Sequence, residues 1–133
     1  TDTKDYRFTP IFFANDPEAT VLGTVKGLDE PGLVIKDLGK RKSVYSSAPM
    51  LHANLLRNIL EQAGVHIYSK GNDLIYANDT FVSITAYEDG KRTVFLTEKA
   101  NVLDALSGEK VGDNISQIDI EAKQYETRIF KLV

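Results

Sequence analysis

The sequence predicts an α+β fold that is mainly antiparallel β, sandwich-like, with one main α-helix around residues 51–63. Many short runs of β-branched and aromatic residues are separated by turn-forming clusters, which is typical of strands. Only one segment has apolar residues at helical spacing. The chain has 133 residues, of which 42% are hydrophobic and 26% charged, so it has a globular composition and can bury a sizeable core.

The first part of the chain is expected to form strands. Residues 6–13 are rich in aromatic and branched side chains, but Pro10 lies among them and favours an edge strand or two short pieces. Pro31 should break the chain, and Gly39 lies where a hairpin would turn. Three further strands are expected here, over residues 20–25, 33–38 and 42–45.

The helix is predicted from a single apolar stripe. Its members recur every three or four residues: Leu51, Leu55, Leu56, Ile59, Leu60 and Ala63. Ser46 or Ser47, followed by Pro49, could cap the start, and Gly64 lies where a left-handed C-terminal cap belongs. We expect the stripe to pack against a sheet.

Short strands are expected to fill the rest of the chain. In residues 81–87, Val82, Ile84 and Ala86 should share one face. The run Glu88-Asp89-Gly90-Lys91 is a hairpin signal, and the even spacing of the strands favours an antiparallel sandwich or meander. The expected strands cover residues 65–68, 74–77, 81–87, 92–96, 101–103, 115–120 and 127–132.

We expect one compact unit over residues 1–133, with a subdivision into strands plus helix (1–66) and an antiparallel β domain (67–133). The chain opens at Thr1 rather than at methionine, so we expect a processed protein or a piece of a longer one. It has no cysteine, and therefore no disulfide and no thiolate metal site. No targeting segment is recognisable, and the compartment stays open.

Charge and hydropathy argue against two classes of partner. The net charge is −3, from 16 basic and 19 acidic residues, which gives no broad electrostatic reason to bind nucleic acid or an anionic membrane. No apolar run approaches the roughly 20 residues of a membrane helix.

No catalytic, metal or cofactor site is predicted. His52 and His66 lack metal-binding spacing and are expected to be structural, hydrogen-bonded residues. A small hydrolase that uses either histidine with a nearby serine is the alternative, but no sequence pattern supplies the orienting acid. Ser46 and Ser47 lack the flanking glycines of a nucleophile elbow.

The tyrosines provide the candidate ligand contacts. Tyr68 and Tyr76, together with Tyr87, could form an aromatic platform for a sugar ring, and His66 lies beside them in sequence. Tyrosines on strands also serve as half-buried packing with a hydrated hydroxyl, which is their commoner use. We carry His66, Tyr68 and Tyr76 forward as candidate contacts.

Ten segments, in order along the chain, resemble the C-terminal region of bacterial β-galactosidase-like glycoside hydrolases. In the first half they are residues 21–25 (VLGTV), 31–36 (PGLVIK), 43–49 (SVYSSAP), 55–57 (LLR) and 63–68 (AGVHIY). In the second half they are residues 81–86 (FVSITA), 93–96 (TVFL), 102–104 (VLD), 107–109 (SGE) and 127–130 (TRIF). The resemblance extends over residues 10–132.

In those enzymes a catalytic barrel is followed by a glutamine-amidotransferase-like, flavodoxin-like trimerisation domain and then a small β domain. The resemblance implies that this chain carries the end of the former and the whole of the latter. The catalytic glutamates lie in the barrel, so no catalytic residue is carried over. The strands of the first half would lack parallel neighbours, and are expected to join the antiparallel sheet instead.

The function implied is that of a non-catalytic C-terminal accessory or assembly module of a carbohydrate-active enzyme. The alternative is a protein–protein interaction module or a carbohydrate-binding module of unknown ligand. The expected partners are the remainder of a larger polypeptide or further copies of the chain, with carbohydrate as a further candidate.

Overall fold

The computed structural model describes residues 9–133, and the chain divides into two compact units. The N-terminal unit is Thr1–His52 and the C-terminal unit is Ala53–Val133. The fold is mostly antiparallel β in two sheets with one short helix, which confirms the predicted fold class. The assignment of domains to residues 1–66 and 67–133 stays a prediction.

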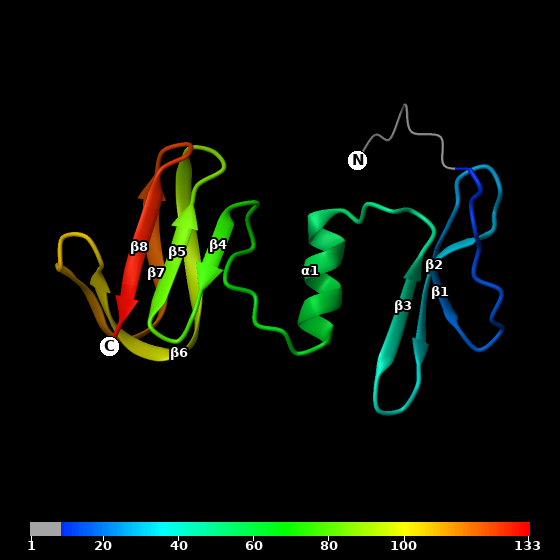
Figure 1. Cartoon of the computed structure of the whole chain (residues 1–133), viewed down its shortest axis with the longest axis horizontal. Coiled ribbons are helices and arrows are strands. Elements are labelled where there is room, and N and C mark those ends of the chain that lie inside the picture. The colour runs from blue at the N-terminus through cyan, green and yellow to red at the C-terminus, as the bar shows by residue number, and fades with distance from the viewer. Residues whose placement is uncertain (1–8) are drawn as a thin grey trace. The chain divides into compact units, whose positions relative to one another are not determined.

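The N-terminal unit contains a three-stranded antiparallel sheet (Figure 1). Its strands, in spatial order, are β1 (Thr20–Thr24), β2 (Pro31–Asp37) and β3 (Lys42–Ser46). The predicted hairpin joins β2 to β3, with Gly39 at a positive φ of 79°. The Asp37 carboxylate accepts a hydrogen bond of 2.8 Å from the Gly39 amide, so the turn is fixed locally.

Three expectations about this part of the chain are wrong. Residues 9–13 belong to no strand, while residues 6–8 of that prediction lie outside the described part. Pro31 begins β2 instead of breaking the chain, because a proline at the first strand position withholds no ladder hydrogen bond. The sheet β1-β2-β3 is separate and does not join the larger sheet.

The C-terminal unit holds the helix and a five-stranded antiparallel sheet of order β4-β5-β8-β6-β7 (Figure 1). Its elements are α1 (Ala53–Gln62), β4 (Leu74–Ala77), β5 (Phe81–Thr85), β6 (Gly90–Asp104), β7 (Lys110–Ala122) and β8 (Thr127–Leu132). β8 comes last along the chain yet lies in the centre of the sheet.

The sheet bends around one apolar core. Strand β6 contributes Val94 from its first half and Val102 from its second half, and its register shifts between Phe95 and Ala100. The strand therefore curves, so that both halves face the same interior. The predicted alternation in β5 is confirmed, since Val82 and Ile84 are buried. The core cluster comprises Val82, Ile84, Val94, Leu96, Val102, Ile118 and Phe130.

Two expectations about this sheet are wrong. The run from Glu88 to Lys91 does not close a hairpin, because β8 lies between β5 and β6. Residues 65–68 form no strand, although they run along β6, where the Phe95 amide donates to the Tyr68 carbonyl over 2.8 Å. One such bond is too little to make a ladder.

Helix α1 begins at Ala53 and ends just before Gly64, whose φ is 78°. The Val65 amide donates to the Leu60 carbonyl over 2.9 Å, which is the closing bond of a Schellman cap. No residue of α1 is buried, so the expected packing of its stripe on a sheet is wrong. Over residues 9–133, the structure has no helix that is long and apolar enough to cross a membrane.

The two serines expected to cap α1 have other partners. The Ser46 hydroxyl donates to the Ala48 carbonyl and accepts from its amide, while the Ser47 hydroxyl donates to the Gly32 carbonyl. Both serines therefore stabilise the end of β3 rather than the start of the helix.

Candidate functional site

The loop that connects α1 to β4, residues 63–73, borders three depressions within the C-terminal unit. Their volumes are about 330, 400 and 220 Å³, and Lys70 lines all three. We call them together the Lys70 groove. Besides Lys70, the groove is lined chiefly by Glu61, His66, Asn72, Lys91 and Phe95.

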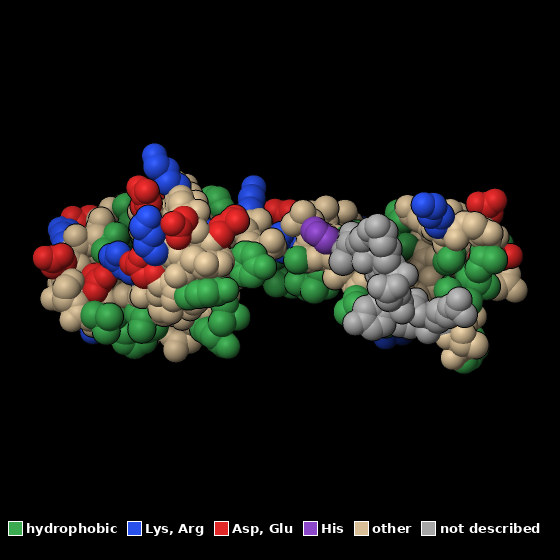
Figure 2. All heavy atoms as spheres, turned by 90° about the horizontal axis from the view of Figure 1, so that it is seen from above, with side chains coloured by type: hydrophobic (Ala, Val, Ile, Leu, Met, Phe, Trp, Pro, Cys, Tyr) green, Lys and Arg blue, Asp and Glu red, His purple; other side chains and the backbone are tan. Residues whose placement is uncertain are grey.

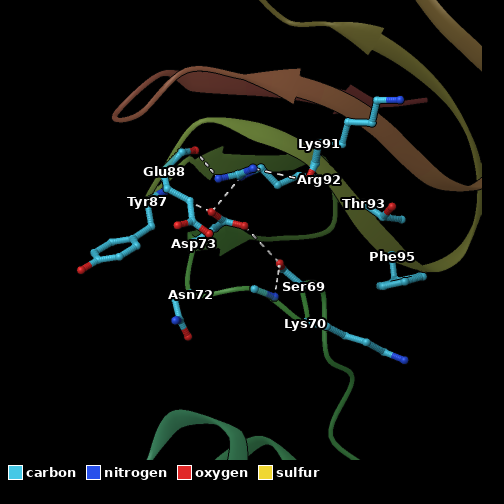
Figure 3. A pocket seen from close by; sticks show the side chains of 11 residues that line it. Ser69, Lys70, Asn72, Asp73, Tyr87, Glu88, Lys91, Arg92, Thr93 and Phe95 are labelled. Atoms are coloured by element: carbon cyan, nitrogen blue, oxygen red, sulfur yellow. Dashed lines mark hydrogen bonds and ion pairs between the residues drawn. The ribbon is translucent and has the colours of Figure 1, made fainter.

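One wall of the groove is fixed by an almost fully buried ion pair. Arg92 at the start of β6 donates through Nε to Asp73 Oδ1 over 3.1 Å, and the two side chains are 9% and 4% exposed. Asp73 Oδ1 also accepts from the Tyr87 amide at 3.0 Å, and Arg92 donates to the Glu88 carbonyl (Figure 3). Because both charges are hydrogen-bonded as well as paired, their burial is compensated.

The other wall is held by the helix. Arg57 of α1 donates to the Gly71 carbonyl and, over 2.9 Å, to Asn72 Oδ1. Within the loop, the Ser69 hydroxyl accepts from the Gly71 amide over 3.1 Å. Polar contacts thus attach α1 to the loop.

The structure brings two of the three predicted contacts together. The rings of His66 and Tyr68 meet edge to face, with centroids 4.5 Å apart and an interplanar angle of 87°. His66 Nε2 lies 2.9 Å from the Phe95 carbonyl; because a carbonyl oxygen only accepts, Nε2 carries the proton. His66 lines the groove, whereas Tyr68 packs against the core, as its alternative interpretation predicted.

Tyr76 is not part of this site. It lies on β4 opposite Ser83 of β5, its side chain is 68% exposed, and it lines none of the three depressions. The structure therefore separates it from His66, although the sequence places it only ten residues away.

Sequence reasoning missed most residues of the groove. Lys70, Asn72 and Asp73 fall between the strands expected at residues 65–68 and 74–77, and Arg92 and Phe95 fall within the strand expected at 92–96. Nothing local marks them, because the loop meets β6 only through long-range contacts such as the ion pair between positions 73 and 92. An acid and a base nineteen residues apart form too common a pattern to single out.

The charges in the groove are mixed and partly unpaired. Lys70 Nζ lies 5.7 Å from the centroid of the Phe95 ring, a cation–π contact. Neither Lys70 nor Lys91 has a carboxylate within ion-pair distance among residues 9–133, and neither Glu61 nor Glu88 has a cation there.

One carboxylate beside the groove has a shifted pKa. The Thr93 hydroxyl donates to Asp119 Oδ1 over 2.6 Å, and Gln117 donates to Oδ2 over 2.9 Å. The bond from Thr93, followed by that from Gln117, holds the pKa of Asp119 below its usual value. Asp119 is therefore a fixed acceptor next to β6 rather than a proton donor near neutral pH.

The chemistry that the groove offers follows from the groups that line it. In the described part of the chain, no three His, Cys, Asp or Glu side chains lie close enough together to hold a metal ion. The proton on His66 Nε2 is bonded to a main-chain carbonyl instead of facing a nucleophile. What the groove offers is a set of hydrogen-bonding groups beside an aromatic ring.

The chain is thus a mostly antiparallel β protein of two sheets and one short helix. No protein-family model matches it, and no curated protein does either. Among solved structures, it is similar to a β-galactosidase from Bacillus circulans sp. alkalophilus.

This similarity is one of fold. The TM-score is 0.59 at 17% sequence identity, and the alignment covers 87% of this chain. It spans only 18% of the Bacillus chain, so the resemblance is to a small part of a larger enzyme.

Proposed function

We propose that this protein is a non-catalytic accessory module of a carbohydrate-active enzyme, and that it stabilises or assembles that enzyme. The observation that supports the proposal is the match of 87% of the chain to 18% of a β-galactosidase. The portion matched is far smaller than a whole glycoside hydrolase.

The proposal is tested by the size of the native polypeptide and by the proteins that bind to it. An antibody against residues 53–133 should detect, in the cells that make the protein, either one much longer polypeptide or a stable complex with glycosidase activity on a nitrophenyl galactoside. A free chain of about the size described here, with no glycosidase in its immunoprecipitate, would contradict the accessory role. The isolated chain should hydrolyse no nitrophenyl glycoside.

A second candidate function is a protein–protein interaction made by α1. The apolar stripe of this helix is incompletely covered: Leu56 is 45% exposed, and Leu55, Ile59 and Leu60 are only half-buried. An amphipathic helix whose apolar side stays in water favours association. The domain assignment implied by the sequence, the end of an assembly domain, would place a subunit contact here.

Light scattering across a range of concentrations tests this second function. Self-association that is lost in Leu56→Asp, and retained in the exposed control Lys99→Asp, would support an interface on α1. A strict monomer at all concentrations would count against association between copies of this chain, and would leave another polypeptide as the partner.

A further inference from the structure

We propose that the Lys70 groove binds a neutral saccharide. The proposal deepens the accessory function above. It rests on that function only where it assumes that an enzyme is attached to the module, because the argument for the ligand comes from the groove itself. Three features carry it: the balance of unpaired charges, the apolar ring beside them and the rigidity of the walls.

The charge balance decides the class of ligand. The groove holds Arg57, Lys70, Lys91 and Arg92 against Glu61, Asp73 and Glu88, a net charge of +1. The pairing of Arg92 with Asp73 satisfies two of these groups, and Arg57 is bonded to the loop. Two ammonium groups and two carboxylates remain available.

An ion of either sign would meet both attraction and repulsion here. An anion drawn to Lys70 also approaches Glu61, which lines two of the same three depressions. A hydroxyl group, in contrast, both donates and accepts, so a ligand with several hydroxyls can accept from the lysines and donate to the carboxylates. Hydrogen bonds to charged groups are the stronger kind, which suits a ligand without charge.

The surface of the C-terminal unit agrees with this balance. On the face of the larger unit that Figure 2 shows, Lys and Arg side chains alternate with Asp and Glu. Such a surface does not concentrate polyanions or polycations by long-range attraction.

The apolar part of the groove suits the C–H face of a sugar ring. Phe95 is half-buried at its floor, with Ile67 and Val65 nearby. In Figure 3, Lys91, Thr93 and Phe95 follow one another along β6, and Lys70 lies beside the Phe95 ring, with its Nζ 5.7 Å from the ring centroid. An aromatic face with polar groups around it accommodates a pyranose, which is apolar on its faces and polar at its rim.

The walls are fixed before any ligand arrives. Asp73 and Arg92 hold the loop to β6, and Arg57 holds it to α1. A preorganised site loses less conformational entropy on binding than a flexible one. The geometry points to a shallow, polar site for one or two sugar units.

The test is an NMR titration of the ¹⁵N-labelled 133-residue chain. The probes are galactotetraose, cellotetraose and xylotetraose as neutral ligands, with trigalacturonate as the anionic comparison. At least one neutral probe should shift the amides of residues 66–73 and of Phe95. Lys70→Ala should weaken that binding by about tenfold, the effect of losing one charge-assisted hydrogen bond.

Lys91→Ala should also weaken binding, while Lys99→Ala, on the same strand but outside the groove, should not. The spectra of the variants show at once whether each is folded. Shifts with trigalacturonate alone, shifts confined to the β4 surface around Tyr76, or no shifts with any probe would each overturn the proposal. Because the titration uses the isolated chain, its failure leaves the accessory function, tested by immunoblot, standing.

Discussion

The burial of a charged residue decides how much it contributes to the stability of this protein. The Asp73–Arg92 pair is almost wholly buried, whereas Lys123 and Asp89 form a 3.4 Å pair with side chains 82% and 65% exposed. Coulomb attraction in water is weak and is offset by the entropy of holding long side chains. A buried charge that loses its partner, in contrast, has no water to replace it.

Asp73→Ala should therefore lower the free energy of unfolding by about 3–5 kcal/mol, because the buried Arg92 loses its counter-charge and the Arg92 Nε and the Tyr87 amide both lose their acceptor. Lys123→Ala, which removes the exposed pair and leaves the bond from the Gln124 amide to Asp89 in place, should cost less than about 1 kcal/mol. Urea denaturation of the two variants measures the difference. Equal losses of unfolding free energy would show that the buried pair contributes no more to stability than the exposed pair.

Acid stability should depend on Asp104. The Ser107 amide, and next the Leu106 amide, donate to its carboxylate over 2.9 and 3.0 Å, and hold its pKa below the ordinary value of 3.8. A lowered folded-state pKa contributes stability above pH 3.8, and this stability is lost as the pH falls through the folded value.

The melting temperature should thus fall less steeply in Asp104→Asn than in the unaltered protein between about pH 4 and pH 2. Thermal melts at half-unit pH intervals provide the measurement. Parallel curves for the two proteins would rule out Asp104 as a contributor to acid unfolding.

Among the secondary-structure elements, α1 depends most for its stability on the residue that caps its C-terminal end, Gly64. Gly64 takes a positive φ of 78°, and a Cβ placed there would meet nothing within 4 Å. Any loss on substitution therefore comes from the backbone conformation and not from a steric clash.

Gly64→Ala should destabilise the helix end by about 1–2 kcal/mol, while Gly64→Asn should restore much of the loss because asparagine tolerates the left-handed region. Circular dichroism and urea denaturation of both variants follow the effect. Equal losses in alanine and asparagine would mean that the side chain, and not the φ angle, matters.

Elements with a strong periodic pattern were predictable, and those set by distant partners were not. The alternation of the buried Val82 and Ile84 in β5 follows from the period of two, which local chemistry enforces. The segments at 9–13 and 65–68 have strand-like composition but lack neighbours along most of their length. Strand propensity reports a fit to a pleated surface, so it fails where no such surface adjoins.

The candidate site was less predictable than the fold. His66 was singled out and does line the groove, but Lys70 comes from a loop that runs beside β6, and Phe95 comes from β6 itself. That proximity depends on the order of the strands in the sheet. The turn at Glu88 indicated that β5 and β6 are neighbours, whereas the order β4-β5-β8-β6-β7 places β8 between them. A turn signal fixes a change of direction and not the neighbour on the far side.

At the scale of the molecule, the two units should differ in stability. Among the described residues, Val34 is the one buried hydrophobic residue of the N-terminal unit, while the C-terminal unit has a contiguous core. Amide hydrogen exchange should therefore be slower in β5, β6 and β8 than in β1, β2 and β3.

Phe130→Ala should cost about 3–5 kcal/mol and speed exchange throughout the five-stranded sheet, with little change in β2. Mass spectrometry of exchanged peptides separates the two sheets. If exchange in β2 accelerated as much as in β8, the units would unfold together rather than separately.

The central place of β8 has a consequence for how the protein is made. Strands β5 and β6 both pair with β8 and not with each other, so the sheet cannot close until residues 127–132 have been synthesised. The sheet therefore stays open while the ribosome is still adding β6 and β7. Nascent chains paused before that point would present unpaired strand edges to one another and to chaperones. Closure of the larger sheet therefore waits until β8 has been synthesised.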